Sequence, residues 1–101
     1  MSLDTEGVWI KVTSTGAVGP AKDVLFLGII LINGGAACSI VLNNNQSSGG
    51  AEQMTCSDGS STAKNMTQVM PNFNSMIAGG MYCTLTGSNA FGYIGYRQVR
   101  G

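Results

Sequence analysis

The stretch Val24-Leu25-Phe26-Leu27-Gly28-Ile29-Ile30-Leu31-Ile32 decides the fold class of this chain. It is apolar on both alternating phases and rich in Ile and Leu, which predicts a strand covered on both faces. Its nine residues are far fewer than the roughly 18 to 20 that span a membrane as a helix, so we expect no membrane segment. Asn33-Gly34-Gly35 follows directly and indicates a turn of the hairpin type.

Further short strands are expected on both sides of this stretch. In Val8-Trp9-Ile10-Lys11-Val12-Thr13 the apolar residues alternate, which places Trp9 on the face opposite Val8, Ile10 and Val12. The amide- and glycine-rich residues 43–50 predict an exposed loop. The expected strands are residues 8–13, 24–32, 37–42, 51–56, 66–70, 81–86 and 90–97.

The last two strands are expected to form a hairpin through a three-residue loop, Gly87-Ser88-Asn89. No segment of the chain has the apolar pattern of a convincing amphipathic helix. About seven short strands with turn signals between them predict an all-β fold, a single small antiparallel β-sandwich or barrel of jelly-roll-like form. We expect residues 1–101 to be one domain in which residues 1–7 are a flexible N-terminal segment.

The charge content is unusually low. Five Lys or Arg residues balance five Asp or Glu residues, and only 10% of the chain is charged, against about 25% in an average domain. This argues against nucleic-acid binding, which needs a basic face. A lone small domain normally has a charge-rich surface, so the shortage suggests that partners cover part of this one.

Catalysis is not expected. The chain has no histidine, which removes the commonest general base and all His-containing nucleophile pairs and metal sites. Ser57-Asp58-Gly59-Ser60 offers one acid, too few for a calcium loop, and reads better as a β-turn. We therefore expect no enzymatic activity, no cofactor and no metal. The carboxylates are scattered along the chain at Asp4, Glu6, Asp23, Glu52 and Asp58.

The three cysteines form no CxxC pair and leave an odd thiol whatever pairs. Cys38 and Cys83 fall in step with larger apolar residues, Ile40 and Leu85, as small core residues of a strand do. We expect them to be buried reduced thiols, with Cys56 more exposed than the other two.

The segment Gly79-Gly80-Met81-Tyr82-Cys83-Thr84-Leu85-Thr86-Gly87, followed by an aromatic strand to Arg97, resembles small β-proteins of tailed phages. In that family a G-[LM]-Y-V-x-[VL]-x-G segment precedes the last strand, and here Cys83 stands where Val is usual. The resemblance covers roughly residues 22–97. It implies a structural, oligomeric module of the virion, present in the host cytoplasm before assembly, in contact with other virion proteins and without catalytic residues. The matching positions are Gly80, Met81, Tyr82, Leu85 and Gly87.

The chain is therefore expected to self-associate as a non-enzymatic structural module. The second apolar face of residues 24–32 needs cover, and a neighbouring subunit supplies it. Strand glycines such as Gly92 and Gly95 fit either a bend of the strand or a close contact between subunits. The candidate interface residues are Trp9, Leu25, Leu27, Ile29, Leu31, Tyr93 and Tyr96.

A carbohydrate- or receptor-binding module is the alternative. Aromatic side chains such as Trp9 and Tyr96 can stack on a sugar, and Arg97 can hold an anionic group. Residues 1–7 carry two acids and no basic residue, so they do not resemble a signal peptide.

Overall fold

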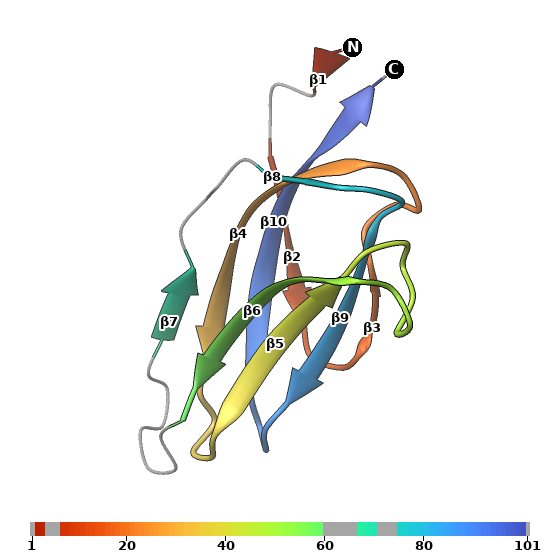
Figure 1. Cartoon of the computed structure of the whole chain (residues 1–101). Coiled ribbons are helices and arrows are strands. Elements are labelled where there is room, and N and C mark those ends of the chain that lie inside the picture. Colours follow the sequence, from red (N-terminus) through yellow and green to blue (C-terminus); the bar gives the residue numbers. More distant parts are fainter. Residues whose placement is uncertain (1, 4–6, 60–66, 71–74, 101) are drawn as a thin grey trace.

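The computed structural model describes residues 2–3, 7–59, 67–70 and 75–100. These residues form two antiparallel sheets, which face each other as two layers (Figure 1). The predicted all-β sandwich is confirmed. The strands are β1 (Ser2–Leu3), β2 (Val8–Val12), β3 (Gly16–Val18), β4 (Val24–Ile32), β5 (Cys38–Asn43), β6 (Glu52–Asp58), β7 (Thr67–Met70), β8 (Ser75–Ile77), β9 (Met81–Thr86) and β10 (Phe91–Arg100).

The strand order is that of a jelly roll. Sheet I has six strands, with β10 and β4 at its centre, β1 and β2 beside β10, and β7 and β8 beside β4. Sheet II has four strands in the order β3-β9-β5-β6. The pairs β5–β6, β4–β7, β3–β9 and β2–β10 are nested in the sequence, as if one long hairpin had been folded over itself.

Both predicted hairpins are wrong. Residues 33–35 lead from β4 in sheet I to β5 in sheet II, and residues 87–90 lead from β9 in sheet II to β10 in sheet I. A turn signal identifies a reversal of the chain, but burial of the apolar side chains decides which strands pair. The true hairpin joins β5 to β6 through the polar loop that was expected to be exposed.

The two crossing turns pack against each other at one end of the sandwich. A Cβ atom on Gly34 would overlap the backbone of Asn89, and one on Gly87 would overlap Cys38. Gly87 also has a φ of +111°, which L side chains rarely adopt. These glycines are therefore required where backbone meets backbone.

The core lies between the two sheets and is built from alternating side chains of both. On β5 the residues Cys38, Ile40 and Leu42 point inward, and on β9 Met81 and Cys83 do. Sheet I contributes fully buried residues from its central strands β4 and β10 and from β8. These are Val24, Phe26, Ile29, Leu31, Ile77 and Ile94.

A β-bulge changes the phase of β4. Gly95 pairs with Gly28, but the next residue, Tyr96, pairs with Phe26, so Leu27 has no partner on β10. The inward-facing residues of β4 are therefore even-numbered before the bulge (Val24 and Phe26) and odd-numbered after it (Ile29 and Leu31). The expected strand with two apolar faces is present, with a fully buried inner face and a half-buried outer one.

Three short strands, β1, β3 and β8, were not expected from the sequence, since each has only two or three residues. The expected strand at residues 51–56 is longer in the structure, because β6 continues to Asp58. Residue 66 of the expected strand at 66–70 lies outside the described residues, and the remainder forms β7. The expectation that residues 1–7 are flexible falls mostly on residues 1 and 4–6, which also lie outside them.

Candidate interaction surface

The outer face of sheet I is apolar. Its residues alternate with core residues on the same strands, and cross-strand register aligns Tyr93 with Ile30, Phe91 with Ile32, and Leu25 with Met76. Trp9 is 50% exposed and Met76 45% exposed, whereas the other members are half-buried by their neighbours. We call this set the apolar face: Trp9, Leu25, Ile30, Ile32, Met76, Phe91 and Tyr93.

Trp9, the chain's single tryptophan, has a fixed place on this face. It pairs with Gly95 across β2 and β10. A Cβ atom on Gly95 would lie 2.7–2.8 Å from three atoms of the indole, so the ring rests with one face over the glycine. The absence of a side chain at Gly95 therefore holds an exposed aromatic ring flat against the sheet.

Two cations lie beside the apolar face. The ammonium group of Lys11 is 4.8 Å from the centroid of the Phe91 ring, a cation–π contact. Phe91 in turn meets Tyr93 edge to face, with ring centroids 6.2 Å apart. Arg97 is next to Leu25 on the neighbouring strand. Among the described residues, the strands of this face carry no acidic side chain.

The outer face of sheet II has a different chemistry. Its outward residues are mostly polar and include five serines or threonines; Ser39 and Thr86 share a hydrogen bond of 2.6 Å between their hydroxyl oxygens. Hydroxyl groups bind water readily, whereas the apolar face of sheet I does not. The two outer faces are therefore unequal, and the apolar one is the surface suited to a partner. The hydroxyl-bearing residues are Ser39, Thr55, Ser57, Thr84 and Thr86.

The structure separates the candidate interface residues into two groups. Trp9, Leu25 and Tyr93 belong to the apolar face. Ile29, Leu31 and Tyr96 lie in the core, with exposed fractions of 0%, 0% and 8%. Leu27 is 9% exposed and lies against Gly7 rather than in the core cluster.

Sequence reasoning missed four members of the apolar face: Ile30, Ile32, Met76 and Phe91. It continued one alternation through β4, whereas the bulge reverses the alternation at Leu27 and Gly28. A glycine in the middle of a strand often marks such a bulge, and here both Gly28 and Gly95 carry that signal.

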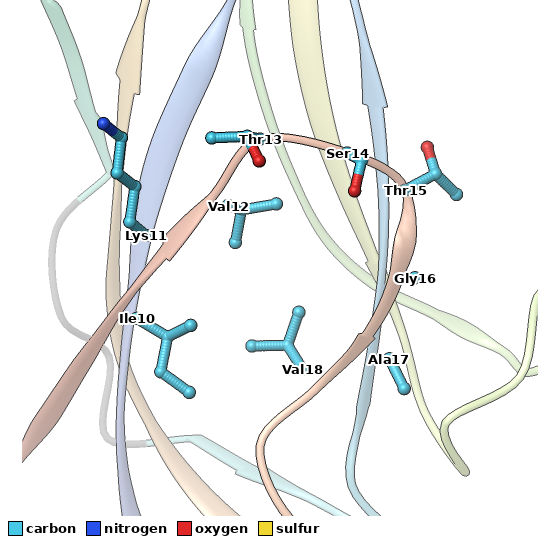
Figure 2. Close-up of a pocket in the computed structure, with 9 residues that line it drawn as sticks. All are labelled: Ile10, Lys11, Val12, Thr13, Ser14, Thr15, Gly16, Ala17 and Val18. Atoms are coloured by element: carbon cyan, nitrogen blue, oxygen red, sulfur yellow. The ribbon is translucent and has the colours of Figure 1, made fainter.

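A small pocket lies where β2 turns into β3, with a volume of about 170 Å³. Figure 2 shows Ile10, Val12 and Val18 turned toward the space under this arch, while Lys11, Thr15 and Ala17 point away. Pockets for small-molecule ligands usually measure about 300–1,000 Å³. This pocket is large enough for a side chain but not for a typical cofactor.

All three cysteines are free and buried. The expectation for Cys38 and Cys83 is confirmed. Cys56 is the most exposed of the three, but only at 7% against 5% for Cys38, and it too is a buried core residue with Ile40 opposite. Burial raises the pKa of the Cys38 and Cys56 thiols, and it raises the pKa of Cys83 to about 11.

We expect stability to fall at alkaline pH because of Cys83. An unfolded thiol titrates near pH 9.0, and the folded pKa is higher, so burial of the neutral thiol stabilises the fold below pH 9. That contribution, up to roughly 2–3 kcal/mol, is lost as the pH rises from about 9 toward 11. Urea unfolding across this range measures it. The Cys83→Ala variant is the control and has a flatter pH dependence; equal slopes for both proteins would contradict the assignment.

Among the described residues, no group of three or more His, Cys, Asp or Glu residues is placed to hold a metal ion. Ser61-Thr62-Ala63-Lys64 has the Ser-x-x-Lys spacing of one class of serine nucleophile, but it lies outside the described residues. The Ser-Asp-Asn and Lys-Thr-Gly motifs that accompany it in that class do not occur in the chain. No helix in the described part of the chain is long and apolar enough to cross a membrane.

Comparison of the chain with protein-family models, with curated proteins and with solved structures gave no match.

Proposed function

We propose that this protein is a non-enzymatic structural module that self-associates through its apolar face, as part of a tailed-phage particle. The observation that carries the proposal is the apolar outer face of sheet I, with Trp9 half exposed on it. The seven residues of the apolar face lie on four strands, β2, β4, β8 and β10. Neighbouring strands lie about 4.8 Å apart and each residue adds about 3.3 Å along a strand, so the face covers roughly 400 Å². The largest apolar patch on a typical monomer is about this size and is often functional.

The composition of the face supports a protein partner. Large aromatic residues are the side chains that most often dominate binding energy at protein interfaces, and this face has Trp9, Phe91 and Tyr93. Trp9 is already fixed over Gly95, so little conformational entropy is lost when a partner covers it. A second copy of the chain offers the same apolar surface, which gives a self-complementary contact.

The place in a phage particle rests on the resemblance of residues 22–97 and on the fold. Jelly rolls are common in viral capsid domains, although they also occur in lectins, so the fold alone does not decide the function. On this proposal the protein is in the virion, or in the host cytoplasm before assembly, and contacts copies of itself and other virion proteins.

We expect light scattering behind size exclusion to find an oligomer at tens of micromolar, well above the 10.4 kDa of one chain. Met76→Lys places a charge on the apolar face and is expected to lower the measured mass, while Thr84→Lys on the outer face of sheet II leaves it unchanged. Fluorescence of Trp9 shifts to the blue on association, because the ring loses contact with water. A wild-type protein that is monomeric at these concentrations would contradict the proposal.

Carbohydrate binding is the second candidate function, and one observation favours it. The indole of Trp9 lies flat over Gly95 with its other face open, the arrangement that stacks on a sugar ring. Tyr96 has no part in this, because it is buried. A glycan array probed with wild type, Trp9→Ala and Met76→Lys separates the two functions: glycan binding lost only in Trp9→Ala would favour the sugar site.

A further inference from the structure

The edges of the two sheets are not equally protected. Open strand edges tend to pair with other chains, and proteins usually block them with short strands, bulges, proline or inward-pointing charges. Four edge strands of this molecule are short: β1 and β3 have two and three residues, β7 four and β8 three. The edge strand β6 has seven residues, but two devices protect it.

These devices lie at the two ends of β6. Leu42 pairs with Met54 and Asn43 with Glu52, so Gln53 forms a bulge. At the other end Asp58, which is 6% exposed, occupies an inward-facing position in step with Cys56. An inward-facing carboxylate makes it costly to extend the sheet past β6.

The edge strand β2 is less protected: a lysine can also block an edge, but the ammonium group of its single charged residue, Lys11, lies over the Phe91 ring. The five residues of β2 pair with β10 in an unbroken register, without a bulge or a proline. Its outward side chains, Trp9 and Lys11, lean over Gly95 and Phe91 on β10 and so away from the free edge. In the part of the chain that the structure describes, no strand pairs with the other side of β2.

The core is also uncovered along this edge. Val8 has the same phase as Val12, yet Val8 is 47% exposed and Val12 5%. The pocket under the β2–β3 arch opens beside the same row of side chains and is lined by Ile10 and Val12 (Figure 2). An added strand next to β2 would cover Val8 and close this side of the sandwich.

We propose that β2 pairs antiparallel with β2 of a second copy, about a twofold axis at Ile10; the inference rests on the proposed self-association. The inward-facing row of β2, Val8, Ile10 and Val12, is symmetric about Ile10 and consists of β-branched residues only. Full overlap of the two strands sets Ile10 opposite its own copy and Val8 opposite Val12, and such β-branched pairs are favourable across strands. Strand pairing of this kind is a common mode of protein association.

The pairing has a consequence for the apolar face. It joins two copies of sheet I into one continuous sheet, so the outer face doubles from roughly 400 to roughly 800 Å². About 800 Å² per partner is the size of a standard protein interface. Edge pairing thus builds an apolar face large enough to bind a second such dimer or another protein of the particle.

The Val8→Lys variant tests the edge. It puts a charge into the inward row at the free edge, where Val8 is already half exposed, so the fold is expected to survive. We expect the dissociation constant of the edge dimer, measured by sedimentation velocity, to rise at least tenfold. Ala17→Lys on the edge strand β3 is the matched control and leaves the constant unchanged.

The Ile10→Cys variant tests the register. Residues directly opposite across strands have Cβ atoms about 4.5–5.5 Å apart, close to the roughly 3.5–4.5 Å of a disulfide. We expect mild oxidation to give a disulfide-linked dimer, while Ala17→Cys stays uncrosslinked. The native thiols do not interfere, since all three are buried. The same oxidation of the denatured variant gives the amount of crosslinking that random collision produces, and specific pairing must exceed it.

The outcomes separate this inference from the proposed function. Loss of association in Val8→Lys together with crosslinking of Ile10→Cys supports edge pairing. If Met76→Lys lowers the mass while Val8→Lys does not and Ile10→Cys fails to crosslink, the edge inference is overturned and association through the apolar face stands. A wild type that is monomeric at every concentration overturns both.

Discussion

Replacing Ile29 by aspartate is expected to unfold the domain, whereas the same change at Ile30 is expected to leave it folded and to weaken association through the apolar face. Ile29 is fully buried in the core beside Leu31 and Ile94 on the central strands of sheet I. A carboxylate there has no water. Burying it, or the protonated acid that replaces it, together with the loss of the isoleucine side chain, costs a large part of the roughly 5–15 kcal/mol that stabilise a small domain. Far-UV circular dichroism and urea unfolding of the purified variant measure the loss.

Ile30 is the matched control because it is the next residue on the same strand but belongs to the apolar face. Its side chain is half-buried against Tyr93, so an aspartate there keeps access to water and costs far less. We expect a native circular dichroism spectrum and a reduced mass in light scattering. Unfolding of both variants, or of neither, would contradict the phase that the bulge gives to β4.

The second large effect is expected at Gly87. An alanine there has a φ of +111° to adopt, and its Cβ overlaps Cys38 at the start of β5, next to the other crossing turn. Strain of the backbone and overpacking each cost about 1–3 kcal/mol, so we expect a loss of about 3–5 kcal/mol of unfolding free energy. For a domain of this size that lowers the melting temperature by about 15–30 °C.

Gly35→Ala separates the two causes. Gly35 has the same φ of +111°, but a Cβ atom there meets nothing within 4 Å. Its substitution therefore carries the backbone strain alone, and we expect about 1–2 kcal/mol. Calorimetry of both variants gives the comparison. Equal melting temperatures would show that the close packing of the two turns contributes nothing.

The positions of the longer strands could be predicted from the sequence because alternation and turn residues are local signals. The alternation in Val8–Val12 and the Cys38 and Cys83 phases are all present in the structure. Strand pairing could not be predicted in the same way. The Asn33-Gly34-Gly35 signal is that of a hairpin, yet β4 finds its partners in β7, β8 and β10, which come later in the chain.

Only part of the candidate surface could be predicted, because its residues also depend on how the strands pair. Trp9 and Tyr93 lie on the outer face, as the alternation predicts, because their strands have no change of phase. Ile29 and Leu31 were assigned to the interface because one alternation was continued from Leu25. The bulge that reverses it depends on the register between β4 and β10, and no single strand contains that information.

The central position of β10 has a consequence for how the chain is made. Among the described strands β10 comes last in chain order, yet it lies between β2 and β4 and holds sheet I together. While the ribosome is still synthesising residues 91–100, β4 has no partner on that side, and its apolar residues stay exposed. Formation of sheet I therefore waits for β10, and because most strand pairs join distant segments, folding is expected to be slow. During that interval the nascent chain is open to aggregation and to chaperones.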